Sequence, residues 1–125
     1  MRVLICDDEA DVRMLYRHAF ESHGVDVSEA SDGNECVAAA TLTQPDLIIL
    51  DLFMPERDGL SVLPDLVRLA PDSRVVIVTA HAAVDVFEHA RAHGATTCLD
   101  KLGFLPRVPQ LIERYGRGTL RVTRS

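Results

Sequence analysis

Five polar residues follow apolar segments that are spread along the chain, and their types suit the chemistry of a phosphoryl group. They are Asp7, Asp8, Asp51, Thr79 and Lys101, the last being the only lysine among 13 basic residues. Three carboxylates held close together repel one another unless a cation lies between them. An all-oxygen set of ligands suits Mg²⁺ or Mn²⁺. A hydroxyl and an ammonium nearby would donate to phosphoryl oxygens, and one aspartate would be free to attack phosphorus as a nucleophile.

The apolar segments that precede these residues are predicted to be strands of a parallel sheet. The five segments are Arg2–Cys6, Val25–Ala30, Asp46–Leu50, Arg74–Thr79 and Ala95–Asp100. Three of them carry uninterrupted runs of Val, Ile and Leu, which is typical of strands that helices cover on both faces. The second segment alternates apolar and polar residues, so we expect it nearer to an edge of the sheet.

The spacing of apolar residues between and after the strands predicts five helices. They run from Val12 to Phe20 with a stop at Gly24, from Ser31 or Asp32 to Leu42 before Pro45, over Asp58–Leu69 with Pro64 inside, over Ala83–His93 before Gly94, and over Val108–Tyr115 before Gly116. The alternation of strands and helices predicts an α/β doubly wound fold. Its functional crevice lies at the carboxyl ends of the strands, where the five polar residues stand.

Length and composition suit one globular domain of 125 residues with a formal net charge of −6. The negative charge argues against nucleic-acid binding by this domain. Neither a membrane-spanning run nor a signal-peptide core is visible, so we expect a cytoplasmic protein without membrane contact. Cys6, Cys36 and Cys98 stand in apolar surroundings and are expected to be free, buried thiols.

The segments around the polar residues resemble the receiver domain of bacterial two-component response regulators. The matching segments are Leu4–Glu9, Asp46–Pro55, Asp58–Gly59, Val76–Ala80, Gly94–Ala95 and Leu99–Lys101. The resemblance covers residues 1–115 and leaves residues 116–125 as a basic tail or the stub of a linker. It implies a flavodoxin-like, five-stranded parallel sheet of order 2-1-3-4-5 and a signalling role in place of an enzymatic one.

The resemblance also implies how the phosphoryl group is received. Asp51 would be the phosphoacceptor, attacking a phosphohistidine on a sensor histidine kinase or a His-phosphotransfer protein. Asp8, Asp51 and the main-chain carbonyl of Phe53 would bind Mg²⁺ directly, and Asp7 would act through water. Lys101 would contact a phosphoryl oxygen and, before phosphorylation, Asp51.

The same resemblance implies a switch. Thr79 would move toward the phosphoryl group and change the surface of the last two helices and the last strand, for a downstream protein that the sequence does not identify. The chain would act as a monomer or as a phosphorylation-dependent dimer. The short segment after Tyr115 leaves open whether it is a stand-alone receiver or part of a longer regulator.

Two positions near Lys101 depart from the family pattern. Leu102 stands where proline usually follows the lysine, so we expect a trans peptide bond there and a different path for the next loop. Cys98 stands where the family often has an aromatic residue that swings as the threonine moves. Because a thiol is small and tends to be buried, this large movement is unavailable.

Three residues are expected to flank the phosphoacceptor: Phe53, Ala80 and His81. Phe53 is larger than the polar residues often found two positions after the acceptor. Together with His81 it would limit the access of water, which predicts slow autodephosphorylation.

Two other functions are weighed against a phospho-accepting receiver. A pseudo-receiver acts by protein contact without phosphorylation, but its sequence would lack the acidic pair, Asp51 or Lys101, and all are present. A phosphohydrolase of the haloacid dehalogenase type also uses an aspartate nucleophile and Mg²⁺. It needs a second aspartate at the position of Phe53, and usually a cap insertion for which the chain has no room.

Overall fold

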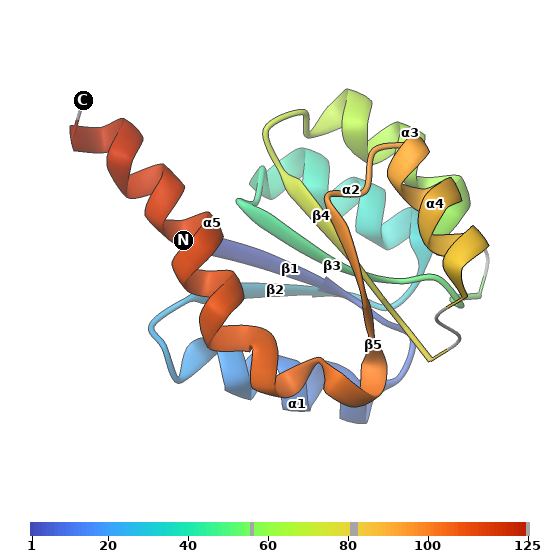
Figure 1. Cartoon of the computed structure of the whole chain (residues 1–125), viewed down its shortest axis with the longest axis horizontal. Coiled ribbons are helices and arrows are strands. Elements are labelled where there is room, and N and C mark those ends of the chain that lie inside the picture. Colours follow the sequence, from blue (N-terminus) through green and yellow to red (C-terminus); the bar gives the residue numbers. More distant parts are fainter. Residues whose placement is uncertain (56, 81–82, 125) are drawn as a thin grey trace.

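The computed structural model describes residues 1–55, 57–80 and 83–124, with only the helix backbone over 117–124. In these residues five parallel strands form one sheet in the order β2-β1-β3-β4-β5 (Figure 1). The strands are β1 (Arg2–Cys6), β2 (Asp26–Ala30), β3 (Leu47–Asp51), β4 (Arg74–Thr79) and β5 (Thr97–Asp100). The helices are α1 (Ala10–Glu21), α2 (Gly33–Thr43), α3 (Gly59–Leu69), α4 (Val84–Ala92) and α5 (Val108–Arg124). The predicted flavodoxin-like α/β fold is confirmed.

Helices cover both faces of the sheet, and each face packs against its own apolar core (Figure 1). Neighbouring strand residues point to opposite faces, so Leu50 packs with α2 and α3 while Ile49 faces the other core. That second core is filled by Phe20, Phe104 and Leu111 from the layer of α1 and α5. Burial of each such side chain contributes about 1.5–3 kcal/mol to folding. The strand ends are therefore held by packing on both sides.

The alternating pattern of the second strand is explained by its place in the sheet. β2 lies at the edge and pairs only with β1, and its residues are mostly exposed or half-buried. The three strands with uninterrupted apolar runs occupy the middle of the sheet and are buried. Both expectations from hydrophobic patterning are confirmed.

Short-range signals set most helix ends. Asp32, and not Ser31, is the N-cap of α2, where its carboxylate accepts from the N–H three residues later at 2.8 Å. Asp58 caps α3 in the same way at 2.9 Å. Gly24 and Gly94 adopt φ values of +78° and +113° just after α1 and α4, a left-handed conformation that glycine adopts without strain.

The prediction that the last helix ends at Gly116 is wrong. α5 continues through this position to Arg124 (Figure 1). Glycine ends a helix when it adopts a positive φ, and Gly116 is not among the residues that do. Glycine inside a helix costs about 1 kcal/mol relative to alanine, which the rest of the helix outweighs. Neither α5 nor any other helix in the described part of the chain is long and apolar enough to cross a membrane.

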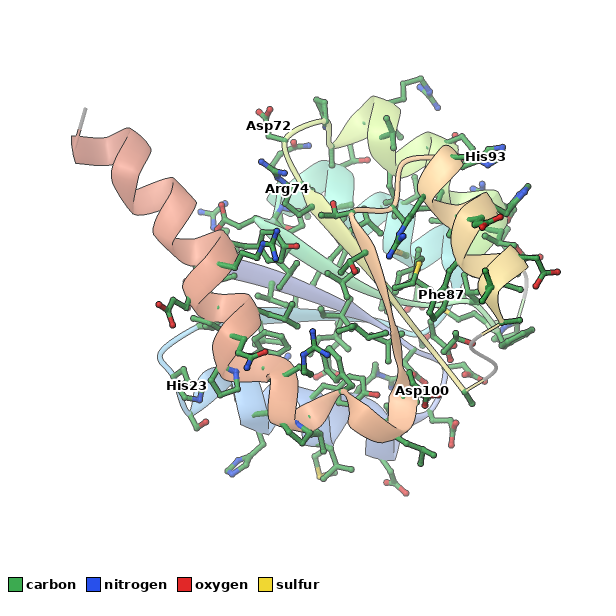
Figure 2. All side chains as sticks on the ribbon, in the orientation of Figure 1. His23, Asp72, Arg74, Phe87, His93 and Asp100 are labelled. Atoms are coloured by element: carbon green, nitrogen blue, oxygen red, sulfur yellow. The ribbon has the colours of Figure 1, made fainter. Side chains whose placement is uncertain are left out.

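The loop after β5 has the trans path expected for Leu102, since no peptide bond between described residues is cis. Asp100, at the end of β5 (Figure 2), accepts a hydrogen bond from the N–H of Leu102 at 2.9 Å. Proline has no N–H and could not make this contact. A 3₁₀ turn over Lys101–Gly103 results, after which Phe104 is fully buried, with its ring 4.6 Å from that of Tyr16.

Gly59 is required for a reason different from the one that its sequence context suggests. A glycine directly after a capping aspartate suggests a positive φ, but the φ of Gly59 is not positive. Instead, a Cβ at this position would lie 2.6 Å from the main-chain oxygen of Asp51 and 2.8 Å from Cα of Leu52. The absence of a side chain lets α3 begin directly against the end of β3.

We expect Gly59→Ala to lower the free energy of unfolding by about 2 kcal/mol, because the backbone around Asp51 must move to admit the methyl group. Gly103→Ala is the matched control, since a Cβ there would meet nothing within 4 Å. Urea denaturation of both variants measures the effect. Equal stability of the two variants would contradict the steric explanation.

Candidate functional site

Four strand ends bring the candidate site residues to one edge of the sheet. Asp7 and Asp8 follow β1, Asp51 ends β3, Thr79 ends β4, and Lys101 follows β5. Carboxylate oxygens of Asp7, Asp8 and Asp51 lie within 4.8 Å of one another. We call these three residues the acidic cluster.

Lys101 links the two buried members of the acidic cluster. Its Nζ lies 3.1 Å from Oδ2 of Asp7 and 3.2 Å from Oδ2 of Asp51. The Lys101 side chain is 19 % exposed, while those of Asp7 and Asp51 are 2 % and 5 % exposed. The ammonium of Lys101 therefore forms ion pairs with two carboxylates that are almost fully removed from water.

Asp51 is in an environment that disfavours its charge. Burial raises the pKa of its carboxyl, and the neighbouring charge of Asp7 raises it further. The N–H of Phe53, which donates to Oδ1 at 3.2 Å, and the ammonium of Lys101 act in the opposite direction but do not outweigh burial. Additional positive charge near Asp51 would therefore stabilise its ionised form.

Lys101 gains from the same arrangement. Burial lowers its pKa, but hydrogen bonds and charge interactions with Asp7 and Asp51 outweigh burial and raise the pKa well above its ordinary value. The lysine is thus strongly held in its charged form. The shifts of Lys101 and Asp51 agree with a site in which one cation is shared among several anions.

The acidic cluster fits a hard divalent cation. Oδ2 of Asp7 has an ion pair with Lys101, yet no described group forms a hydrogen bond of regular geometry with it. Asp8 is exposed and offers a carboxylate to solvent. Mg²⁺ prefers oxygen ligands and keeps several waters, so one exposed and two buried carboxylates suit it.

The structure places the remaining candidate residues as follows. Thr79 is fully buried, one residue beyond Val78, which pairs with Asp51 across β3 and β4. Cys98 is 6 % exposed within the core beneath α4, and burial raises the pKa of its thiol. Ala80 is exposed, and His81 lies outside the described residues.

The other two cysteines are also buried and free, as predicted. Burial and the neighbouring Cys36 thiol raise the pKa of Cys6 well above its ordinary value. Both thiols belong to the apolar core beneath the acidic cluster. The environment of Cys6 favours its neutral, unreactive thiol.

Phe53 and Glu9 complete the rim of the site. Phe53 is 56 % exposed, and its main-chain N–H donates to Asp51. Glu9, which sequence reasoning missed, brings a carboxylate oxygen to 3.9 Å from Nζ of Lys101. Its position directly after the acidic pair could have indicated a place in the site. An acidic residue just before a helix is, however, usually interpreted as a solvated residue that interacts with the helix end.

A doubly wound parallel sheet with an acidic cluster and a lysine at its carboxyl edge defines a flavodoxin-like domain whose acidic cluster is a candidate cation site. The family model of the response regulator receiver domain matches residues 3–113. The chain therefore belongs to this family of signalling domains. Receiver domains bind Mg²⁺ at an acidic pocket, and the acidic cluster is the corresponding group in this chain.

Individual relatives agree with this assignment. The transcriptional regulatory protein PdtaR of Mycobacterium tuberculosis is 42 % identical over 121 residues, covering 91 % of this chain and 58 % of PdtaR. Sporulation initiation phosphotransferase F of Bacillus subtilis is 27 % identical over 114 residues, covering 91 % of this chain and 92 % of that protein. The response regulator domain of Thermotoga maritima CheB has a similar structure, with a TM-score of 0.81 and 29 % identity over 94 % of both chains. This chain spans little more than half of PdtaR.

Proposed function

We propose that this receiver domain accepts a phosphoryl group on Asp51 from a phosphohistidine of a sensor histidine kinase or a His-phosphotransfer protein. The position of Asp51 carries the proposal. Its carboxylate is 5 % exposed, belongs to the acidic cluster and lies 3.2 Å from the ammonium of Lys101. Nucleophile, cation ligands and a phosphoryl-binding charge thus occupy one small site.

In the proposed step, a carboxylate oxygen of Asp51 forms a bond to phosphorus while the bond from phosphorus to the donor histidine nitrogen breaks. The electron pair of the broken bond stays on the imidazole. Bound Mg²⁺ would neutralise charge on the phosphoryl oxygens, with Asp8, Asp51 and the carbonyl of Phe53 as ligands and Asp7 acting through water. Lys101 would exchange one contact with Asp51 for a phosphoryl oxygen.

Thr79 and Cys98 are the proposed switch positions. Thr79, buried at the end of β4, would move toward the phosphoryl group and draw the following loop with it. The small, buried side chain of Cys98 cannot make the swing of an aromatic ring. Backbone shifts would therefore carry the change to the surface of α4, β5 and α5, where a downstream protein or a second copy of the domain would respond.

The proposed signalling unit is residues 1–115. Residues 116–125 would extend from it as a basic tail or as the stub of a linker. The helical backbone of α5 continues into this segment. A change in α5 would therefore be passed on directly to whatever this segment contacts.

Intact-mass spectrometry after incubation with acetyl phosphate tests the proposed function. With Mg²⁺ we expect the mass of one phosphoryl group to be added, and with a chelator we expect no addition. A pseudo-receiver would gain no mass under either condition. Beryllofluoride with Mg²⁺, followed by tyrosine fluorescence or NMR, provides a second reading without covalent transfer.

Phe53→Asn should lose its phosphoryl group about tenfold faster than wild type, because an amide that can orient water replaces an apolar ring two residues after Asp51. The expected factor lies below the roughly 100-fold effect of a well-placed general base, because an amide does not take up the proton. Loss is followed by mass spectrometry in matched Mg²⁺ after removal of the donor. Leu42→Asn, which also replaces an apolar side chain by asparagine, at an 84 % exposed position on α2, is the control. A rate in Phe53→Asn equal to or below that of wild type would contradict the shielding role.

A further inference from the structure

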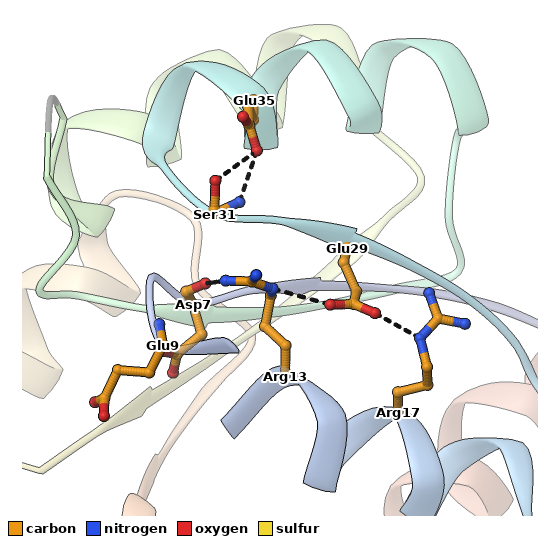
Figure 3. Close-up of polar contacts among 7 residues, drawn as sticks. All are labelled: Asp7, Glu9, Arg13, Arg17, Glu29, Ser31 and Glu35. Carbon is orange, nitrogen blue, oxygen red and sulfur yellow. Dashed lines mark hydrogen bonds and ion pairs between the residues drawn. The ribbon is translucent and has the colours of Figure 1, made fainter. Parts of the chain in front are cut away.

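Arg13, on α1, contacts the main chain of the segment that carries the acidic pair (Figure 3). Its Nη1 donates to the carbonyl oxygen of Asp7 at 2.7 Å, and its Nε donates to Oε1 of Glu29 at 2.9 Å. The Arg13 side chain is only 17 % exposed. One guanidinium therefore joins the end of β1 to the edge strand β2.

Glu29 fixes the direction of the Arg13 guanidinium. Its second carboxylate oxygen accepts from Nε of Arg17 at 2.5 Å (Figure 3). Arg17 also donates to Glu21 at 2.8 Å. Burial alone would raise the pKa of Glu29, but the hydrogen bonds from Arg17 and Arg13 lower it. Glu29 is thus ionised at neutral pH and holds Arg13 through one charge-assisted hydrogen bond.

Asp7 is restrained by three further contacts. Its N–H donates to the carbonyl of Ala30 at 3.1 Å, and its Oδ1 accepts from the N–H of Glu9 at 2.9 Å. Its Oδ2 pairs with Lys101. Arg13 supplies the contact to the one remaining main-chain group, the carbonyl. Ligands that are ordered before binding lose less conformational freedom when a cation arrives.

We propose that Arg13 is a positioning residue of the Mg²⁺ site, which holds the Asp7 carbonyl so that Asp7 and Asp8 face the cation. This inference deepens the proposed function and rests on its Mg²⁺ site. The charge of Arg13 would by itself repel a cation, so the benefit comes from geometry. Outer-shell partners that orient ligands have large effects on metal affinity.

Calorimetric titration of the full chain with Mg²⁺ separates geometry from charge. Arg13→Lys keeps the charge but lacks the planar fork that reaches Asp7 and Glu29 together, and Arg13→Gln removes the charge. We expect the Kd for Mg²⁺ to rise about tenfold in both variants. A purely electrostatic role predicts an unchanged Kd in Arg13→Lys and a lower Kd in Arg13→Gln. Either result would overturn the proposal.

Arg17→Gln is the matched control, because Arg17 binds the same Glu29 from the same helix without contacting Asp7. Its Kd should stay within about twofold of wild type, as for other exposed ion pairs. Amide hydrogen exchange of Glu9 in Mg²⁺-free protein gives a second reading. Exchange should be faster in both Arg13 variants than in Arg17→Gln. Equal exchange in all three would overturn the proposal.

The two proposals fail in different ways. A wild-type chain that binds Mg²⁺ but takes up no phosphoryl group would contradict the proposed function, while a raised Kd in the Arg13 variants would still support the positioning role. Phosphoryl uptake by wild type together with an unchanged Kd in Arg13→Lys would overturn the role of Arg13 alone.

Discussion

The Asp51→Asn variant is expected to take up phosphoryl groups from acetyl phosphate more than about a thousandfold more slowly than wild type, which places uptake below detection. A carboxamide has nearly the same size and shape as a carboxylate but has no negatively charged oxygen that could act as the nucleophile. The acidic cluster also loses one of its three carboxylates. Intact-mass spectrometry over time with saturating Mg²⁺ measures the loss.

This loss will not result from unfolding. Burial and the charge of Asp7 raise the pKa of Asp51, so the folded state binds a proton on Asp51 more readily than the unfolded state does. The contribution of Asp51 to stability therefore falls as pH rises through the interval between its ordinary pKa and its raised one. Asparagine has no such penalty, and Asp51→Asn should be at least as stable as wild type at pH 7.

Asp72→Asn is the matched control, because Asp72 lies at the opposite edge of the sheet, just before β4 (Figure 2). Its phosphoryl uptake should equal that of wild type. Uptake retained by Asp51→Asn would show that another residue is the acceptor. No uptake by wild type, with Mg²⁺ bound, would favour a pseudo-receiver.

Lys101→Met should lower the free energy of unfolding by about 3 kcal/mol at pH 7 without Mg²⁺, which is the range for removing one partner of a buried ion pair. Asp7 and Asp51 are almost fully buried and would both lose their cation. Because the pKa of Lys101 is raised, its pairing with the two carboxylates, while these are ionised, contributes fully to stability below the ordinary lysine pKa of 10.5. This contribution falls as pH rises above that value toward the raised pKa.

Mg²⁺ should restore most of the stability lost in Lys101→Met. Removal of the ammonium takes away a charge that repels the incoming cation, so Mg²⁺ affinity should rise by about tenfold or more. A ligand that binds only the folded state raises its stability in proportion to the logarithm of concentration over Kd. The midpoint temperature of thermal unfolding should therefore rise more steeply with Mg²⁺ concentration in Lys101→Met than in wild type.

Lys101→Arg is the control for charge. It should keep stability and Mg²⁺ affinity near wild type. We expect it to impair switching, because a planar fork replaces the compact charge that must move from a carboxylate to an acyl phosphate. An unchanged stability of Lys101→Met without Mg²⁺, or an unchanged Mg²⁺ affinity, would contradict the shared-cation description of the site.

Most of the fold could be predicted from local pattern. The uninterrupted run Leu47–Leu50 predicts a strand buried on both faces, and β3 lies in the middle of the sheet. Asp32 and Asp58 are N-caps, and each accepts a hydrogen bond from the N–H three residues later. The predicted helix end at Gly116 is wrong, because α5 continues through it. A glycine ends a helix only where it adopts a positive φ, and residue type alone does not determine that conformation.

Contacts between distant segments explain what the pattern did not show. Gly59 is needed because α3 begins against the main chain of Asp51. The spacing of residue types along the sequence does not show this close approach. From the sequence alone, Arg13 on a helix surface and Glu29 on an edge strand are both predicted to be solvated. Only the packing of α1 beside β1 and β2 brings them together at Asp7.

The sequence by itself determined the α/β fold class, the strand ends at which the chemistry-bearing residues stand and the family to which they point, because these depend on periodicity and residue type along one segment. The tertiary structure decided which atoms meet. It placed Lys101 between two buried carboxylates and gave Asp51 its disfavoured charge. Distances, desolvation and shared counterions arise only when separate strands are packed side by side.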